Sequence, residues 1–150
     1  MSKQRIKRLA MVLKMAEDKE QQDLQSWGRC QQKLEEERDK ITQLEGYMTD
    51  YRNTLTFSSQ NLRIQGGQVQ NTIAFIEQIK EACGHQEQQV NLVEQQAEGA
   101  KRVYLESRTK AEALRKLIVK LSAQEKSIAD KAEQKLMDEF AARSARNRTF

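Results

Sequence analysis

The sequence predicts an all-α chain folded as one long antiparallel two-helix coiled-coil hairpin, with the C-terminal helix extending beyond the N-terminal one. Three observations predict this fold. The 150 residues contain no proline, a residue that breaks helix interiors. Two long runs repeat apolar residues at alternating steps of three and four, which is typical of coiled coils. Between the runs lies a short segment that contains the glycine pair Gly66-Gly67.

The first helix is predicted over residues 4–57. Stepping from Ile6 to Leu55 gives fifteen positions, of which twelve are apolar or cysteine. This 3.5-residue period marks the seam that faces a partner helix.

The turn is predicted over residues 58–67, because its serines and glycines disfavour helix. A second run of twenty seam positions begins at Val69, and fifteen of them fit the pattern. The second helix is therefore predicted over residues 68–143, and the tail 144–150 is expected to fray. The whole chain, residues 1–150, is expected to form a single coiled-coil hairpin.

A register follows if Leu55 faces Val69 across the turn. In that register Trp27 lies near Ala97 and Ala100, so that one large side chain meets two small ones.

The predicted seam is weakest at Glu20 and Asp23. In the same register these acids face Tyr104 and Lys101, beside Ser107. Because few apolar contacts are expected there, this stretch should open locally more easily than the rest of the seam.

Residues that could carry catalytic or metal chemistry are sparse. Cys30 and Cys83 lie roughly 16 Å apart along the predicted rod, too far for a disulfide. His85 is expected on the surface, since a two-helix hairpin offers no deep pocket for a catalytic Cys–His pair. The consecutive acids Glu35–Glu37 point in different directions around a helix. We therefore predict no enzyme activity, no cofactor and no metal site.

Both ends of the chain are basic and its middle is acidic. Residues 1–14 hold five basic residues and no acid, and residues 101–150 hold thirteen basic residues against seven acidic ones. No apolar run is long enough for a secretory signal or a membrane span, and two unpaired cysteines fit a reduced cytosolic protein. The basic ends leave open a coiled coil that binds nucleic acid or an anionic membrane surface, although the interleaved aromatics typical of nucleic-acid binding are missing.

Residues 69–86 hold more apolar side chains than one seam can bury. Four residues at steps of four, three and four share one helix face, and we call them the stripe: Phe75, Ile79, Ala82 and Gln86. The excess could form a thicker core with Phe57, Leu62 and Ile64. Alternatively, the stripe is an exposed surface for a partner, of the helix-face kind. The pattern alone leaves both interpretations open.

Three segments resemble the FliJ family of flagellar type III export proteins. They are residues 134–143 (QKLMDEFAAR), the start of the second helix around Asn71, Phe75, Ile76, Ile79 and Ala82, and residues 28–52 of the first helix. The resemblance implies a non-enzymatic hairpin similar to the central stalk of rotary ATP synthases. Such a stalk sits in the ring of the flagellar export ATPase, contacts the export gate protein FlhA and takes part in the cycling of export chaperones.

The resemblance also implies where these partners bind. It assigns the gate contact to the stripe, and its tail favours flagellar export and motility over the stalk of a virulence-type injectisome. We expect the basic end to dock in the ATPase ring through Arg143, Arg146 and Arg148, while the tip bears the stripe toward the gate. The protein is then expected in the cytoplasm, held at the inner face of the membrane by its partners and without nucleic acid.

Overall fold

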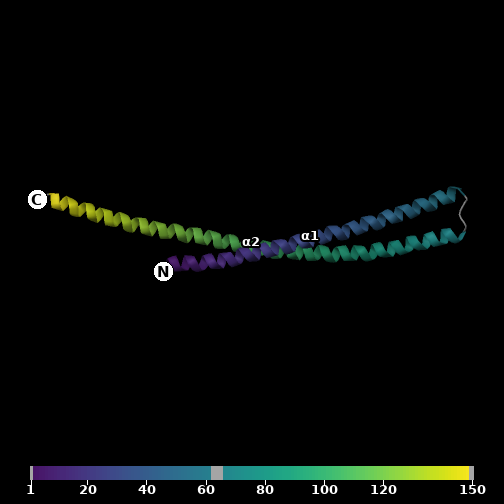
Figure 1. Cartoon of the computed structure of the whole chain (residues 1–150), viewed down its shortest axis with the longest axis horizontal. Helices are drawn as coiled ribbons and strands as arrows, with labels where there is room; N and C mark the ends of the chain where they lie inside the picture. Colours follow the sequence, from purple (N-terminus) through teal and green to yellow (C-terminus); the bar gives the residue numbers. More distant parts are fainter. Residues whose placement is uncertain (1, 62–65, 149–150) are drawn as a thin grey trace. The chain divides into compact units, whose positions relative to one another are not determined.

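The computed structural model describes residues 2–61 and 66–148, and all of these residues are helical. Helix α1 spans Ser2–Asn61 over 60 residues, and helix α2 spans Gly66–Arg148 over 83 residues. The two helices pack against each other as a hairpin (Figure 1). The predicted all-α hairpin is therefore confirmed.

Both helices extend beyond the limits that the sequence suggested. Helix α1 continues into the expected turn as far as Asn61, and α2 begins at Gly66, also within the expected turn. Serine and asparagine cost a helix less than about 1 kcal/mol each, so a long helix can continue through them. The remainder of the expected turn, residues 62–65, lies outside the described residues.

Helix α2 continues to Arg148, five residues beyond its predicted end at residue 143, and the expected fraying of the tail stays a prediction. Its last turn carries Arg146 and Arg148. Positive charges there interact favourably with the negative end of the helix dipole, which supports the extended helix.

The chain divides into two compact units. We call Asp23–Tyr104 the central unit, and Met1–Gln22 together with Leu105–Phe150 the terminal unit. The division cuts α1 next to Asp23, within the polar stretch of the seam that the sequence identified.

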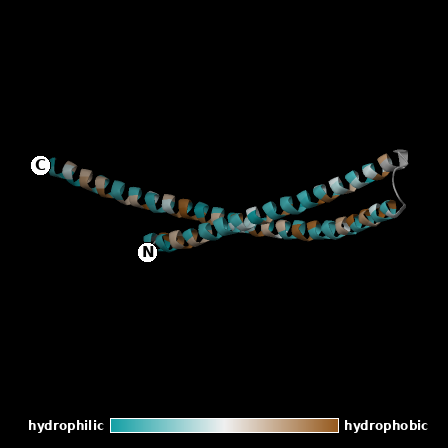
Figure 2. Ribbon diagram, turned by 45° about the vertical axis from the view of Figure 1, so that its right-hand side comes forward, coloured by the Kyte–Doolittle hydropathy of each residue, from teal (hydrophilic) through white to brown (hydrophobic). Residues whose placement is uncertain are grey.

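The core of the central unit lies along the predicted seam. Its buried members are Leu34, Val90, Val93 and Ala97, and Cys30 and Ile41 pack against them. Val93 is only 1% exposed. Hydrophobic residues accordingly recur at intervals along otherwise hydrophilic helices (Figure 2). A 3.5-residue period keeps these positions on the side that faces the partner helix, which is why the pattern predicts them correctly.

In the terminal unit, α2 again buries seam positions and then runs on alone. Ala111 is fully buried, and Ile6 of α1 shares a hollow with Glu125 and Ile128 of α2. Every side chain from residue 131 to 143 is exposed. We call residues 133–148 the overhang, and it is the C-terminal extension that the sequence predicts.

Trp27 has a neighbour that the predicted register did not name. Its ring stacks on Tyr104, with ring centroids 5.6 Å apart and planes inclined by 24°. Tyr104 lies one helical turn beyond Ala100. Stacked aromatic rings gain about 0.5–1.5 kcal/mol beyond the area they bury. That gain depends on the positions of the two rings along their helices, which a pattern of apolar residues does not encode.

Glu20 faces Arg115, so its expected pairing with Tyr104 is wrong. The Arg115 guanidinium donates from Nη2 to Glu20 Oε2 and from Nε to Glu17 Oε1, each at 3.2 Å. The Glu20 side chain is only 15% exposed. An ion pair therefore satisfies the carboxylate that interrupts the apolar seam.

Four glycines lie inside the helices of the central unit: Gly28, Gly46, Gly84 and Gly99. A methyl group added at any of them would meet no other atom within 4 Å. We expect Gly46→Ala and Gly84→Ala each to raise the free energy of unfolding by about 0.5–1 kcal/mol, because alanine loses less backbone entropy in a helix. Urea unfolding followed by circular dichroism measures this change. Destabilisation by either variant would contradict it.

Candidate docking surfaces

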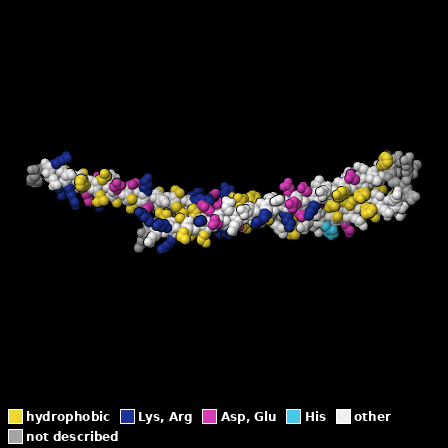
Figure 3. Space-filling view, in the orientation of Figure 1, with side chains coloured by type: hydrophobic (Ala, Val, Ile, Leu, Met, Phe, Trp, Pro, Cys, Tyr) yellow, Lys and Arg dark blue, Asp and Glu magenta, His cyan; other side chains and the backbone are white. Residues whose placement is uncertain are grey.

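An apolar hollow of about 390 Å³ lies between the two helices of the central unit. We call it the aromatic hollow, and its lining consists of Tyr47 and Tyr51 from α1 and Phe75, Gln78, Ile79 and Ala82 from α2. Hydrophobic side chains gather over this part of the helix pair, near the end of α1 and the start of α2 (Figure 3). The hollow thus contains three of the four stripe residues.

Phe75 lies at the surface of the helix pair. Its side chain is 50% exposed, whereas the adjacent Ile76 is buried in the seam. Phe75 stacks on Tyr51 with ring centroids 5.9 Å apart and planes inclined by 17°. Of the residues proposed for a thicker core, Phe57 is itself largely exposed, and Leu62 and Ile64 lie outside the described residues.

Tyr47 and Tyr51 complete the hollow, and sequence reasoning did not assign either of them to a site. The heptad pattern predicts Tyr51 as a seam position and assigns no role to Tyr47. The sequence feature that indicates a shared surface is their spacing, because residues four apart on a helix lie on one face. Both side chains are more than one-third exposed. Two exposed tyrosines on one face of a polar helix segment are unusual enough to mark a surface.

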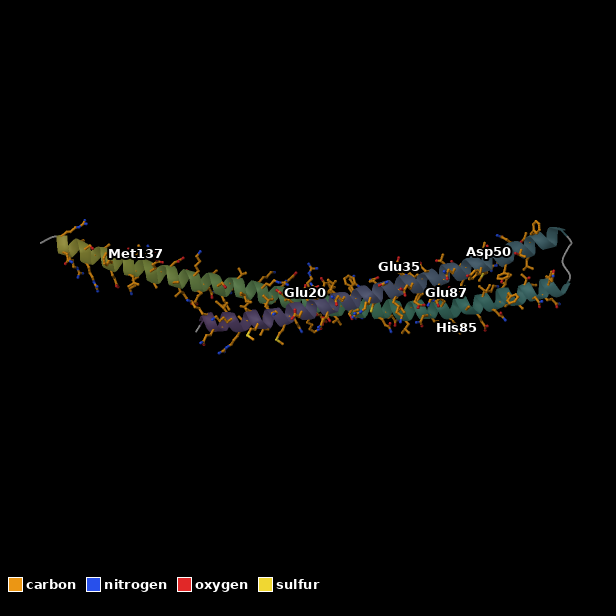
Figure 4. All side chains as sticks on the ribbon, viewed as in Figure 1. Glu20, Glu35, Asp50, His85, Glu87 and Met137 are labelled. Atoms are coloured by element: carbon orange, nitrogen blue, oxygen red, sulfur yellow. The ribbon has the colours of Figure 1, made fainter. Side chains whose placement is uncertain are left out.

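Gln86, the fourth stripe residue, turns its amide toward α1. Its Nε2 donates to the backbone oxygen of Glu37 at 2.9 Å and also to Glu37 Oε2. The amide is therefore engaged within the hairpin, and a docking role for Gln86 stays a prediction. His85, one residue earlier on α2, is exposed (Figure 4).

Glu37 is a carboxylate within the seam, and its residue is only 7% exposed. Besides the bonds from Gln86, it accepts one from Lys40 Nζ to Oε1 at 3.1 Å. The hydrogen bond from Gln86, followed by that from Lys40, lowers the pKa of Glu37 below its ordinary value. These bonds to the charged form keep the carboxylate ionised at neutral pH.

The described residues give little support for catalytic or metal-binding chemistry. Cys30 and Cys83 are both free thiols. Burial, reinforced by Glu45 and Glu87, raises the pKa of the Cys83 thiol, which makes it a poor nucleophile near neutral pH. The described side chains form no group of three potential metal ligands. Nor does either helix, over its described length, include an apolar stretch able to cross a bilayer.

The overhang presents a second surface, in the terminal unit. Leu136, Met137 and Phe140 are each about two-thirds or more exposed. With Arg143 they line a shallow hollow, and Figure 4 marks Met137 on this part of α2. Arg143, Arg146 and Arg148 are all exposed. Cations therefore lie next to an apolar helix face. The sequence-based prediction for this surface named only the three arginines and not the apolar residues beside them.

Comparison with known proteins identifies one family. Residues 5–149 match the family described as Flagellar FliJ protein. Searches among curated proteins and among solved structures gave no match to the chain. The matched range includes the aromatic hollow and almost all of the overhang.

Proposed function

Because this chain belongs to the FliJ family, we propose that it is a stalk that joins the flagellar export ATPase to the export gate through two separate docking surfaces. Membership makes it a non-enzymatic component of flagellar type III protein export. Its partners accordingly belong to the flagellar export apparatus, and the flagellar version is preferred to the injectisome stalk.

The observation that carries this proposal is the exposed aromatic pair of the central unit. Phe75 is half exposed and stacks on Tyr51 above an apolar hollow that also contains Ile79 and Ala82. Rigid aromatic side chains beside a concave apolar surface are typical of the residues that dominate binding energy at protein interfaces. We propose that the gate protein FlhA inserts an apolar side chain or helix face here.

The overhang is the proposed ATPase-docking surface. Arg143, Arg146 and Arg148 supply positive charge that would attract an acidic surface of the ring. Leu136 and Phe140 supply apolar area next to these charges. Hydrolysis occurs in the ring, and the stalk couples it mechanically to the gate and to the handling of export chaperones. The protein then works in the cytoplasm, at the inner face of the membrane through its partners.

Site-specific photo-crosslinking tests the gate contact. A photoreactive phenylalanine analogue is placed at Phe75 or, as a control of matched exposure on the same helix, at Leu92; their side chains are 50% and 49% exposed. With the purified cytoplasmic part of FlhA, we expect a crosslinked product from position 75 and little from position 92. Equal products from both positions, or none from position 75, would overturn the proposed contact.

Charge reversal tests the overhang. Arg143→Glu, Arg146→Glu and Arg148→Glu together should weaken association with the export ATPase about tenfold or more, because like charges repel an acidic partner. Wild-type association should also weaken with added salt, since exposed charges are screened. Isothermal titration at two salt concentrations measures both effects. Crosslinking from position 75 to FlhA should be unchanged.

A matched triple variant controls for net charge. Lys120→Glu, Lys126→Glu and Lys131→Glu alter the same helix by the same charge, at exposed positions before the overhang. If both triple variants lose ATPase binding equally, the interaction depends on overall charge and not on this surface. Equally tight, salt-sensitive binding to unrelated polyanions would favour the alternative of a basic coiled coil for nucleic acid or membrane.

A further inference from the structure

A buried polar pair crosses the seam of the central unit. Glu37 is 7% exposed and lies on α1 three residues after the core residue Leu34. Gln86 of α2 donates to both its backbone oxygen and its carboxylate. Four residues further along α2 the apolar core resumes at Val90. The pair therefore interrupts the apolar core with hydrogen bonds that cross from one helix to the other.

We propose that the Glu37–Gln86 pair fixes the register of α1 against α2 in the central unit. Seam positions recur every seven residues, so an apolar seam can slide by one heptad and still bury apolar side chains. Such a slide would bring Ile79 or Val93 opposite Glu37. Neither side chain can donate a hydrogen bond, so Glu37 would keep only Lys40 of its own helix and the Gln86 amide would lose both of its acceptors. Buried polar groups that lose hydrogen bonds are destabilising. Only the observed register satisfies both polar groups.

The exposed ion pair nearby does not provide the same discrimination. Arg38 Nη2 lies 3.2 Å from Glu94 Oε1, and both side chains are more than half exposed. Exposed pairs contribute about 0–1 kcal/mol. A slide in one direction would bring Glu87 opposite Arg38. Glu87 is also an acid and could replace Glu94 as the partner of Arg38. The buried pair thus distinguishes the observed register from both neighbouring ones, which the exposed ion pair does not.

Register matters because the aromatic hollow is built from both helices. One heptad corresponds to about 10 Å along a helix at 1.5 Å per residue. The Tyr51 and Phe75 rings are 5.9 Å apart, so a slide of that size would separate them. Glu37 and Gln86 are then positioning residues for the hollow. Only this consequence for gate docking depends on the proposed function, whereas the register itself does not.

Distances between two spin labels, measured by double electron–electron resonance, test the register. Labels are attached through Gln32→Cys on α1 and Glu77→Cys on α2, both exposed positions, after Cys30→Ala and Cys83→Ala. We expect a single distance population with the native pair. In Glu37→Leu with Gln86→Leu, we expect a second population displaced by about 10 Å. Replacing a buried polar pair with apolar residues is often neutral or stabilising, so this variant should remain folded by circular dichroism.

Two further variants separate register from general packing. Glu37→Gln with Gln86→Glu exchanges the partners and should restore the single population. Thr72→Leu makes another seam position apolar but removes only a bond within α2, to the Gln68 backbone oxygen, and should leave one population. A single unchanged population in the double leucine variant would overturn the proposal. A displaced population with undiminished photo-crosslinking from position 75 would support the register role and contradict the proposed docking surface.

Discussion

Trp27→Ala is expected to lower the free energy of unfolding by about 3 kcal/mol, the low end of the range for truncating a tryptophan, because the side chain is only partly buried. The variant loses the stack on Tyr104, whose ring centroid lies 5.6 Å from that of Trp27. Urea unfolding followed by circular dichroism measures the change. An unfolding curve that matches the wild type would show that the stack contributes nothing to stability.

Trp27→Phe is the matched control. It retains an aromatic ring against Tyr104 and removes the indole Nε1, a buried atom that has no hydrogen-bond partner among the described residues. Leaving a buried donor unsatisfied is costly, so its removal offsets part of the lost packing. We expect this variant to lose about 1–1.5 kcal/mol. Equal losses from the alanine and phenylalanine variants would mean that ring stacking is not the source of the stability.

Phe75→Ala with Ile79→Ala is expected to weaken association with the export gate by about 2 kcal/mol or more, roughly a 30-fold rise in Kd. Both residues line the aromatic hollow, and truncation removes one of its two stacked rings. Titration of the full chain with the cytoplasmic part of FlhA measures the loss. Association with the ATPase should be unaffected.

The single variant Phe75→Ala distinguishes a docking surface from a structural one, because Ile79 is a partly buried seam residue whose truncation lowers stability in either case. Phe75 is half exposed, so its truncation alone should lower the melting temperature only slightly. Leu92→Ala, at a position of equal exposure on α2, should change neither binding nor stability appreciably. If Phe75→Ala alone melted far below the wild type yet bound the gate normally when folded, Phe75 would be part of the core.

The seam was predictable residue by residue. Of the fifteen positions from Ile6 to Leu55, Tyr51 alone is exposed in the structure. On α2 every predicted position from Val69 to Glu125 is at least partly buried, whereas the last three, Ile128, Ala132 and Lys135, are exposed. This agreement has a simple cause. The side of a helix that a residue occupies depends only on its place in the repeat, which the sequence contains directly.

Partners across the seam were less predictable. Trp27 stacks on Tyr104, and Glu20 pairs with Arg115. Neither partner follows from a pattern that repeats every seven residues, because sliding one helix by a heptad leaves that pattern unchanged. The actual position of one helix along the other depends on particular contacts, such as a ring stack or an ion pair. The geometry of these contacts exists only in the folded molecule.

The sequence by itself determined two proline-free helices, their seam, the overhang and the three arginines near its end. Only the tertiary structure decided that Phe75 is exposed beside Tyr51, that Tyr47 completes a hollow with Ile79, and that Gln86 turns toward Glu37. The physical reason is that the hollow is made by two segments that are distant in sequence. Which side chains meet there depends on how far one helix is displaced along the other.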